Sequence, residues 1–89
     1  MLETAEYRKK LENIVEELEK HFIPAKIKGD GVASFVFTKW ENRAFEIYQS
    51  EDGVIIECWE NEVSQGENEV DSYDQATKLA IAWINNYEK

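Results

Sequence analysis

The chain has 89 residues, of which 43% are hydrophobic and 12% aromatic, and its formal net charge at pH 7 is −9. We expect residues 1–89 to form a single domain, since this length suits one domain and the apolar content is too high for a disordered chain. The acidic balance argues against direct binding to nucleic acid or to an anionic membrane, because both reward clustered lysine and arginine.

The first expected element is a helix over residues 4–21. Its apolar side chains recur at helical spacing, which predicts one buried stripe. Thr4 is the expected N-cap, and Pro24 prevents the helix from continuing. The stripe consists of Tyr7, Leu11, Ile14, Val15, Leu18 and Phe22.

Four strands are expected next, because the apolar period changes to two and short turns interrupt it. The predicted strands span residues 23–28, 32–39, 43–50 and 54–60. Short turns join antiparallel neighbours, so these strands should form a meander. The segment 67–71 can add a short fifth strand after a turn near Gly66.

The pairing of the strands is predicted from loops of three residues in the first two hairpins. These loops place Phe35 opposite Ile47 and Phe37 opposite Phe45, on an apolar face that the helices cover.

The third turn allows two pairings. A loop of Asp52 and Gly53 adds Val54, Ile56 and Cys58 to the covered face. A loop over residues 51–53 would add Ile55, Glu57 and Trp59 instead. We prefer the first pairing, because it buries no carboxylate.

The last expected element is a helix that starts with a capping box, Ser72 to Gln75. Its apolar stripe consists of Ala76, Leu79, Ala80, Trp83, Ile84 and Tyr87. The predicted fold is a two-layer α+β domain, in which an antiparallel meander of four or five strands carries both terminal helices on one face. The order α-β-β-β-β-(β)-α resembles the helix-sheet-helix layout of double-stranded-RNA-binding domains. The resemblance is limited to this layout, since the charge of the chain has the opposite sign. The predicted core is Leu11, Ile14, Val15, Leu18, Phe35, Phe37, Phe45, Ile47, Val54, Ile56, Leu79, Ala80, Trp83 and Ile84.

The negative charge is concentrated in the middle of the chain. The 34 residues between Arg43 and Lys78 contain ten acids and no lysine or arginine, whereas the rest of the chain is nearly neutral. A folded array of carboxylates can dock on a basic surface of a protein partner and imitate the phosphates of a nucleic acid. In size and charge the chain is similar to small acidic inhibitors of restriction and CRISPR nucleases. This interpretation, an acidic inhibitor or adaptor, names Glu57, Glu60, Glu62, Glu67, Glu69 and Asp71 as the protein-binding patch. The simpler interpretation is that these acids serve solubility alone.

An alternative function rests on the uncovered face of the sheet. The predicted pairing places Trp40, Tyr48 and Trp59 there, and exposed aromatic patches commonly mark interfaces. The protein would then be a homodimer, or would bind another protein through this aromatic face.

Catalysis, metal binding and cofactor binding find little support in the sequence. His21 is the only histidine and Cys58 the only cysteine, so neither a zinc site nor an activated nucleophile is expected. The single cysteine and the lack of a long apolar run favour the cytoplasm, or a host's cytoplasm if the gene is viral.

Overall fold

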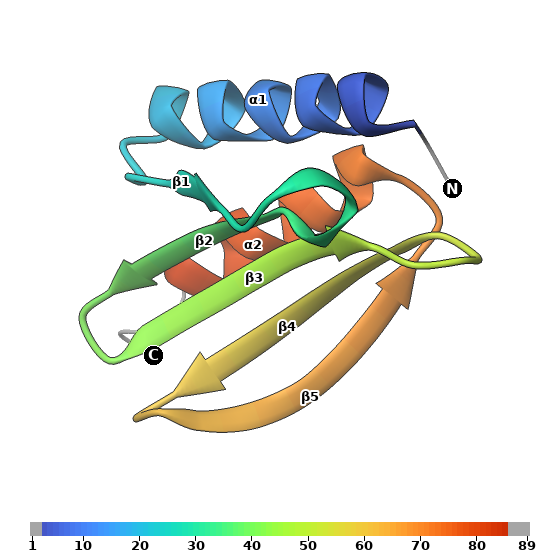
Figure 1. The fold of residues 1–89 in the computed structure, drawn as a ribbon. Coiled ribbons are helices and arrows are strands. Elements are labelled where there is room, and N and C mark those ends of the chain that lie inside the picture. Colours follow the sequence, from blue (N-terminus) through green and yellow to red (C-terminus); the bar gives the residue numbers. More distant parts are fainter. Residues whose placement is uncertain (1–2, 86–89) are drawn as a thin grey trace.

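The computed structural model describes residues 3–85, so Tyr87 of the predicted second stripe lies outside the described residues. The chain forms two helices and one five-stranded sheet (Figure 1). In order, the elements are α1 (Thr4–Lys20), β1 (Lys26–Lys28), the 3₁₀ turn η1 (Gly31–Ala33), β2 (Phe35–Trp40), β3 (Arg43–Gln49), β4 (Val54–Glu60), β5 (Val63–Val70) and α2 (Tyr73–Asn85).

The sheet is an antiparallel meander in the order β1-β2-β3-β4-β5. Both helices pack on one of its faces, with α1 against β1 and β2 and α2 against β3 and β4 (Figure 1). The predicted two-layer α+β fold is therefore confirmed, including its fifth strand. Neither α1 nor α2 has both the length and the apolar character that crossing a membrane requires.

The core lies between the helices and the sheet, and most of its members were predicted. Val36 and Ile23 join the core, as do Tyr7 and Ala76 from the predicted helix stripes. Val15 and Trp83 are only half-buried, and Leu79 is 44% exposed. The buried hydrophobic residues are Tyr7, Leu11, Ile14, Leu18, Ile23, Val36, Phe45, Ile47, Val54, Ile56, Ala76, Ala80 and Ile84.

Helix α1 ends in a Schellman motif, which explains where its apolar stripe stops. Phe22 adopts a left-handed φ of 62°, and the backbone N–H of Ile23 donates to the carbonyl of Leu18 at 3.0 Å. Buried Ile23 and Leu18 then supply the apolar pair that accompanies this motif. Phe22, predicted in the stripe, is 89% exposed because the chain has already left the helix. At the other end Glu3 is the N-cap, not Thr4.

The predicted pairing of β2 with β3 is wrong by one residue. Trp40 pairs with Arg43, so the loop holds two residues, Glu41 and Asn42, and Glu41 takes the left-handed φ of 56°. A shift of one residue moves every side chain of a strand to the other face. Val36 and Thr38 therefore point into the core, and Phe35 and Phe37 lie on the opposite face, where they are half-buried.

The pairing of β1 with β2 also differs from the prediction. Residues 31–33 form η1 and not the start of a strand, and β1 begins at Lys26 and not at residue 23. Ile27 then pairs with Val36 on β2.

The third turn places the chosen side chains in the core, but with a longer loop than predicted. Gln49 pairs with Val54, so residues 50–53 form a loop of four residues that keeps Val54 and Ile56 buried. The backbone N–H of Gly53 donates to the Ser50 hydroxyl at 3.0 Å within this loop.

Strand β5 is longer than predicted. It begins at Val63 and contains Gly66, where the sequence predicted a turn. Asn61 and Glu62 form the turn before it, with left-handed φ angles of 53° and 66°. The pairing with β4 shifts between Glu57 and Trp59, and Gly66, with φ of 102°, absorbs this bulge.

Helix α2 begins where predicted, with a variant of the capping box in which the Gln75 side chain bonds to the residue before Ser72. The Ser72 hydroxyl accepts from the N–H of Gln75 at 3.1 Å, and the Gln75 amide oxygen accepts from the N–H of Asp71 at 3.0 Å. Near its other end, the indole N–H of Trp83 donates to the carbonyl of Ala44 at 3.1 Å. The Arg43 guanidinium lies 3.9 Å from the centre of the Trp83 ring, so this helix end is fastened to β3.

Candidate functional site

The face of the sheet opposite the helices, called the outer face below, is the candidate site. Side chains alternate between the two faces of a strand, so the pairing determines which residues share the outer face. No helix covers this face within residues 3–85. Its residues are Lys26, Lys28, Phe35, Phe37, Lys39, Ala44, Glu46, Tyr48, Ile55, Glu57, Trp59, Ser64, Glu67 and Glu69.

Four of these residues form a carboxylate cluster: Glu46, Glu57, Glu67 and Glu69. Glu46 pairs directly with Glu57, and Glu57 pairs directly with Glu67, so three neighbouring strands each contribute one carboxylate to a row. Neighbouring strands lie about 4.8 Å apart, which spaces the row regularly. Within the described residues, no lysine or arginine forms an ion pair with a member of the cluster.

Hydroxyl groups hold the cluster in place without neutralising it. The Tyr48 hydroxyl donates to Glu67 at 2.7 Å, the Ser64 hydroxyl to Glu57 at 2.8 Å and the Ser50 hydroxyl to Glu69 at 2.8 Å. Burial, followed by the hydrogen bond to Glu67, raises the pKa of Tyr48. Tyr48 therefore stays a neutral donor at physiological pH, and the three hydroxyl groups fix the positions of the carboxylates that they contact.

The charge of Glu46 is less favourable than that of an isolated carboxylate. Burial is the main cause and the neighbouring charge of Glu57 adds to it, so the pKa of Glu46 is raised, although Lys28 opposes the shift. The row is thus a place where like charges are held together against their mutual repulsion.

Glu46→Gln is expected to raise the free energy of unfolding at pH 7 by about 0.2 to 1 kcal/mol, because it removes a charge that is partly buried and is also repelled by Glu57. The native state binds the Glu46 proton more tightly than the unfolded chain does, so the ionised side chain lowers stability as pH rises above the ordinary carboxyl value of 4.5. Below that value both states are protonated and the penalty is absent. Urea unfolding at neutral and acidic pH, with the exposed Glu16→Gln as control, tests this. A gain that stays the same in acid would contradict it.

Aromatic side chains lie beside the carboxylates. The Lys28 ammonium stands 4.1 Å from the centre of the Phe37 ring, and Tyr48 pairs with Ile55 on the next strand. A shallow hollow of about 280 Å³ opens between Phe37 and Trp59. It is lined by Phe37, Lys39, Asn42, Ala44, Glu46, Trp59 and Glu62. The outer face therefore combines apolar contact area with a fixed negative array.

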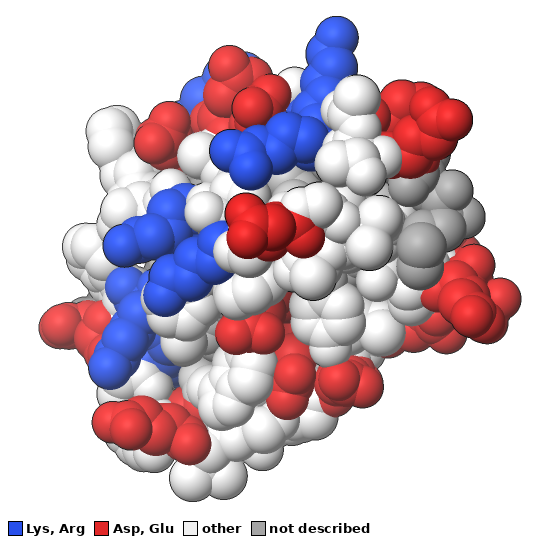
Figure 2. All heavy atoms as spheres, in the orientation of Figure 1, with Lys and Arg blue, Asp and Glu red and all other residues white. Residues whose placement is uncertain are grey.

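The outer face is electrically divided. Figure 2 shows lysine and arginine side chains gathered over the β1 and β2 side, and carboxylates over the β3 to β5 side. On the positive side the outer-face residues are Lys26, Lys28 and Lys39. A charged partner would therefore be oriented as well as attracted.

The structure brings together some of the predicted patch residues and separates others. Glu57, Glu67 and Glu69 belong to the carboxylate cluster. Glu62 lies in the β4–β5 turn at the rim of the hollow. Glu60 is on the helix-covered face, where its carboxylate lies 3.3 Å from the Arg43 guanidinium, so its charge is neutralised. Asp71 follows β5 at the start of α2, away from the row.

The predicted aromatic site also changes. Tyr48 and Trp59 lie on the outer face as predicted. Trp40 does not, because its pairing with Arg43 turns it to the helix side, where it is 41% exposed. Phe35 and Phe37 were predicted in the core but lie on the outer face, because the β2–β3 loop holds two residues and not three.

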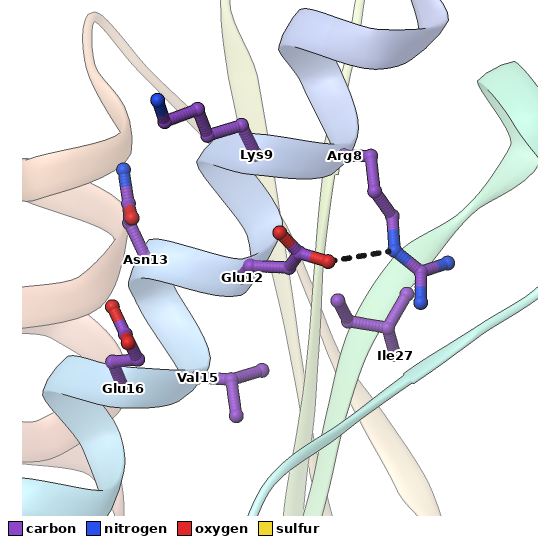
Figure 3. A pocket seen from close by; sticks show the side chains of 7 residues that line it. All are labelled: Arg8, Lys9, Glu12, Asn13, Val15, Glu16 and Ile27. Atoms are coloured by element: carbon purple, nitrogen blue, oxygen red, sulfur yellow. Dashed lines mark ion pairs between the residues drawn. The ribbon is translucent and has the colours of Figure 1, made fainter.

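A second hollow, between α1 and β1, has a mixed lining. Figure 3 shows Arg8 and Glu12 above Ile27, and the guanidinium and carboxylate lie 3.5 Å apart. Both side chains are more than half exposed, so this ion pair is a weak surface interaction at one side of the hollow. Its other lining residues are Lys9, Asn13, Val15 and Glu16.

Groups able to carry out chemistry are scattered. Residues 3–85 contain no group of three or more histidine, cysteine, aspartate or glutamate residues that could hold a metal ion. Burial raises the pKa of the Cys58 thiol to about 11, so the reactive thiolate is scarce at neutral pH. His21 is exposed and lies 3.5 Å from Glu17 at the end of α1.

No protein-family model, curated protein or solved structure matches the chain.

Proposed function

We propose that the protein is a non-catalytic inhibitor or adaptor that docks its carboxylate cluster on a basic surface of a protein partner. The observation that carries this proposal is the row of Glu46, Glu57 and Glu67 on three adjacent strands. Like charges directly opposite each other destabilise a sheet, so a row in which no described lysine or arginine forms an ion pair costs stability that docking on a basic surface would recover. A row of this kind is a poor choice if solubility is its only role.

Three further features support docking through this face. The carboxylates are fixed by hydroxyl donors, which lowers the entropy lost on binding. Tyr48 and Trp59 lie beside them and are of the residue types that most often anchor interfaces. The sheet holds the cluster rigidly, as a site on strands is held more precisely than one on loops.

The partner that best suits this array is a protein that handles nucleic acid. Its basic groove normally holds phosphates, and a regular set of carboxylates would compete for the same cations. In this form of the proposal the protein acts as a nucleic-acid mimic, and it binds no nucleic acid itself.

The test starts from the partner that copurifies with the tagged protein from its native cell. Replacing Glu57, Glu67 and Glu69 by glutamine removes three charges and leaves an amide oxygen to accept each hydroxyl. We expect affinity to fall about tenfold or more and its salt dependence to weaken. The matched control replaces three exposed acids of α1, Glu6, Glu16 and Glu19, by glutamine. Equal affinity of the two triple variants for the partner would overturn the proposal. If duplex DNA competes with the protein for the partner, the protein acts as a nucleic-acid mimic.

A second candidate function is self-association through the outer face. The observation that favours it is the uncovered group of Phe35, Phe37, Tyr48, Ile55 and Trp59. A two-fold axis parallel to the strands would set the lysine side of one copy against the carboxylate side of the other.

Sedimentation separates the two candidates. Self-association predicts a dimer that Trp59→Ala weakens and that high salt dissociates. Docking on another protein predicts that the isolated protein is a monomer, with or without Trp59→Ala and at any salt concentration. Trp40→Ala is the matched control, because Trp40 lies on the helix side of the sheet.

A further inference from the structure

The free edge of β5 is the longest unpaired backbone segment at the border of the sheet. β5 has eight residues, and its residues 63–69 are all exposed. Within residues 3–85, β4 is its only strand neighbour, and Figure 1 shows β5 at the open border of the sheet. Such an edge presents backbone donors and acceptors that another strand can pair with.

The two sides of this edge have different chemistry. On the outer face, Glu67 and Glu69 supply the negative charge of the carboxylate cluster. On the helix side an apolar groove of about 590 Å³, the α2–β5 groove, separates α2 from the end of the sheet. It arises because two helices cover only part of five strands, and it leaves Leu79 44% exposed. The groove is lined by Arg43, Ile56, Cys58, Asn68, Leu79, Ala82 and Trp83.

One half of the edge is better prepared for pairing than the other. The Gln65 amide donates to the carbonyl of Val63 at 2.9 Å, and the N–H of Gly66 donates to the Ser64 hydroxyl at 3.1 Å. Side chains of β5 therefore already engage backbone groups in its first half. The second half, from Glu67 to Val70, lies between the carboxylates and the α2–β5 groove.

We propose that an extended segment of the partner adds to β5 as a sixth strand, with basic and apolar side chains in alternation. The period of two in a strand sends its basic side chains to Glu67 and Glu69 and its apolar side chains into the α2–β5 groove. This inference rests on the proposed function and names the part of the basic partner that the protein recognises.

A second copy of β5 does not suit this edge. It would bring Glu67 and Glu69 of one chain against the same carboxylates of the other, and like charges across neighbouring strands are destabilising. Edge carboxylates of this kind exclude self-pairing and still admit a cationic strand. The charge therefore selects the occupant.

The first experiment uses a synthetic peptide that alternates lysine with valine and has the length of β5. Alternating lysine and serine removes the groove contacts, and alternating glutamate and valine removes the charge match. We expect each control peptide to bind at least about tenfold more weakly than the lysine–valine peptide. Equal binding of all three peptides, or no binding by the lysine–valine peptide, would overturn the proposal.

Variants of the protein test the two sides of the edge separately. Leu79→Ser should weaken binding of the lysine–valine peptide about tenfold. Val32→Ser, at another exposed apolar side chain, should leave it unchanged. Glu67→Gln with Glu69→Gln should weaken it similarly, whereas Glu16→Gln with Glu19→Gln should not. If Leu79→Ser binds as tightly as the unchanged protein, the groove is not part of the site.

Amide hydrogen exchange distinguishes strand addition from docking on the outer face alone. Strand addition should slow exchange about tenfold or more at those amides of residues 67–70 that point away from β4. Docking through the side chains of the outer face would leave these amides unprotected. Peptide binding without this protection would overturn the sixth strand, while the proposed function would still be judged by the charge variants and the copurified partner.

Discussion

Phe45→Ala is expected to lower the free energy of unfolding by about 3 to 5 kcal/mol, the range typical of a phenylalanine removed from a core. Phe45 is fully buried between the sheet and the helices. The same substitution at Phe37 should lower it by only about 1 kcal/mol, since Phe37 is half-buried on the outer face and loses mainly its contact with Lys28. Urea unfolding followed by tryptophan fluorescence measures both.

The comparison is a direct test of strand pairing. A loop of three residues between β2 and β3 would bury Phe37 and Phe45 side by side, so both substitutions would then be equally damaging. Domains of this size have about 5 to 15 kcal/mol of stability, and Phe45→Ala could leave too little folded protein to measure. Phe45→Leu with Phe37→Leu then supplies the same comparison with smaller losses.

Tyr7→Phe is expected to lower the free energy of unfolding by about 2 to 4 kcal/mol, a large effect for the loss of one oxygen atom. The Tyr7 hydroxyl is buried, donates to the carbonyl of Ser34 and accepts from the N–H of Gln49 at 3.2 Å. It thereby joins α1 to the start of β2 and to the end of β3. Without it, the Ser34 carbonyl and the Gln49 N–H each lose this buried hydrogen bond, and such a loss costs about 1 to 3 kcal/mol.

Tyr73→Phe is the matched control for this change. The Tyr73 ring lies 6.5 Å from that of Tyr7 and is half-buried, and its hydroxyl has no hydrogen bond to another described residue. We therefore expect Tyr73→Phe to change the free energy of unfolding by less than about 0.5 kcal/mol. Thermal or urea unfolding of both variants decides the matter. A loss at Tyr7 no larger than that at Tyr73 would mean that the buried hydroxyl does not hold α1 to the sheet.

Local chemistry made the helices predictable. The stripe from Tyr7 to Leu18 and the capping box at Ser72 are patterns within one element, so no information about distant residues was needed. The C-terminal end of α1 was harder, because the left-handed Phe22 has no sequence signal of the kind that glycine supplies.

Which residues of β2 belong to the candidate site depended on the number of residues in the β2–β3 loop. The presence of Tyr48, Trp59 and Glu57 on the outer face was predicted, because β3 and β4 keep the expected alternation. Phe37 was assigned to the wrong face and so was Trp40, since both lie on β2, and one residue more or less in the loop before Arg43 exchanges the faces of that strand.

The amino-acid sequence by itself determined the order of the elements, the concentration of negative charge between Arg43 and Lys78 and the need for one covered sheet face. These properties follow from residue type and spacing. Only the tertiary structure decided which carboxylates act together. Pairing between strands set Glu46, Glu57 and Glu67 in one row and turned Glu60 toward Arg43, because neighbours across a sheet are chosen by loop length and bulges and not by proximity in the chain.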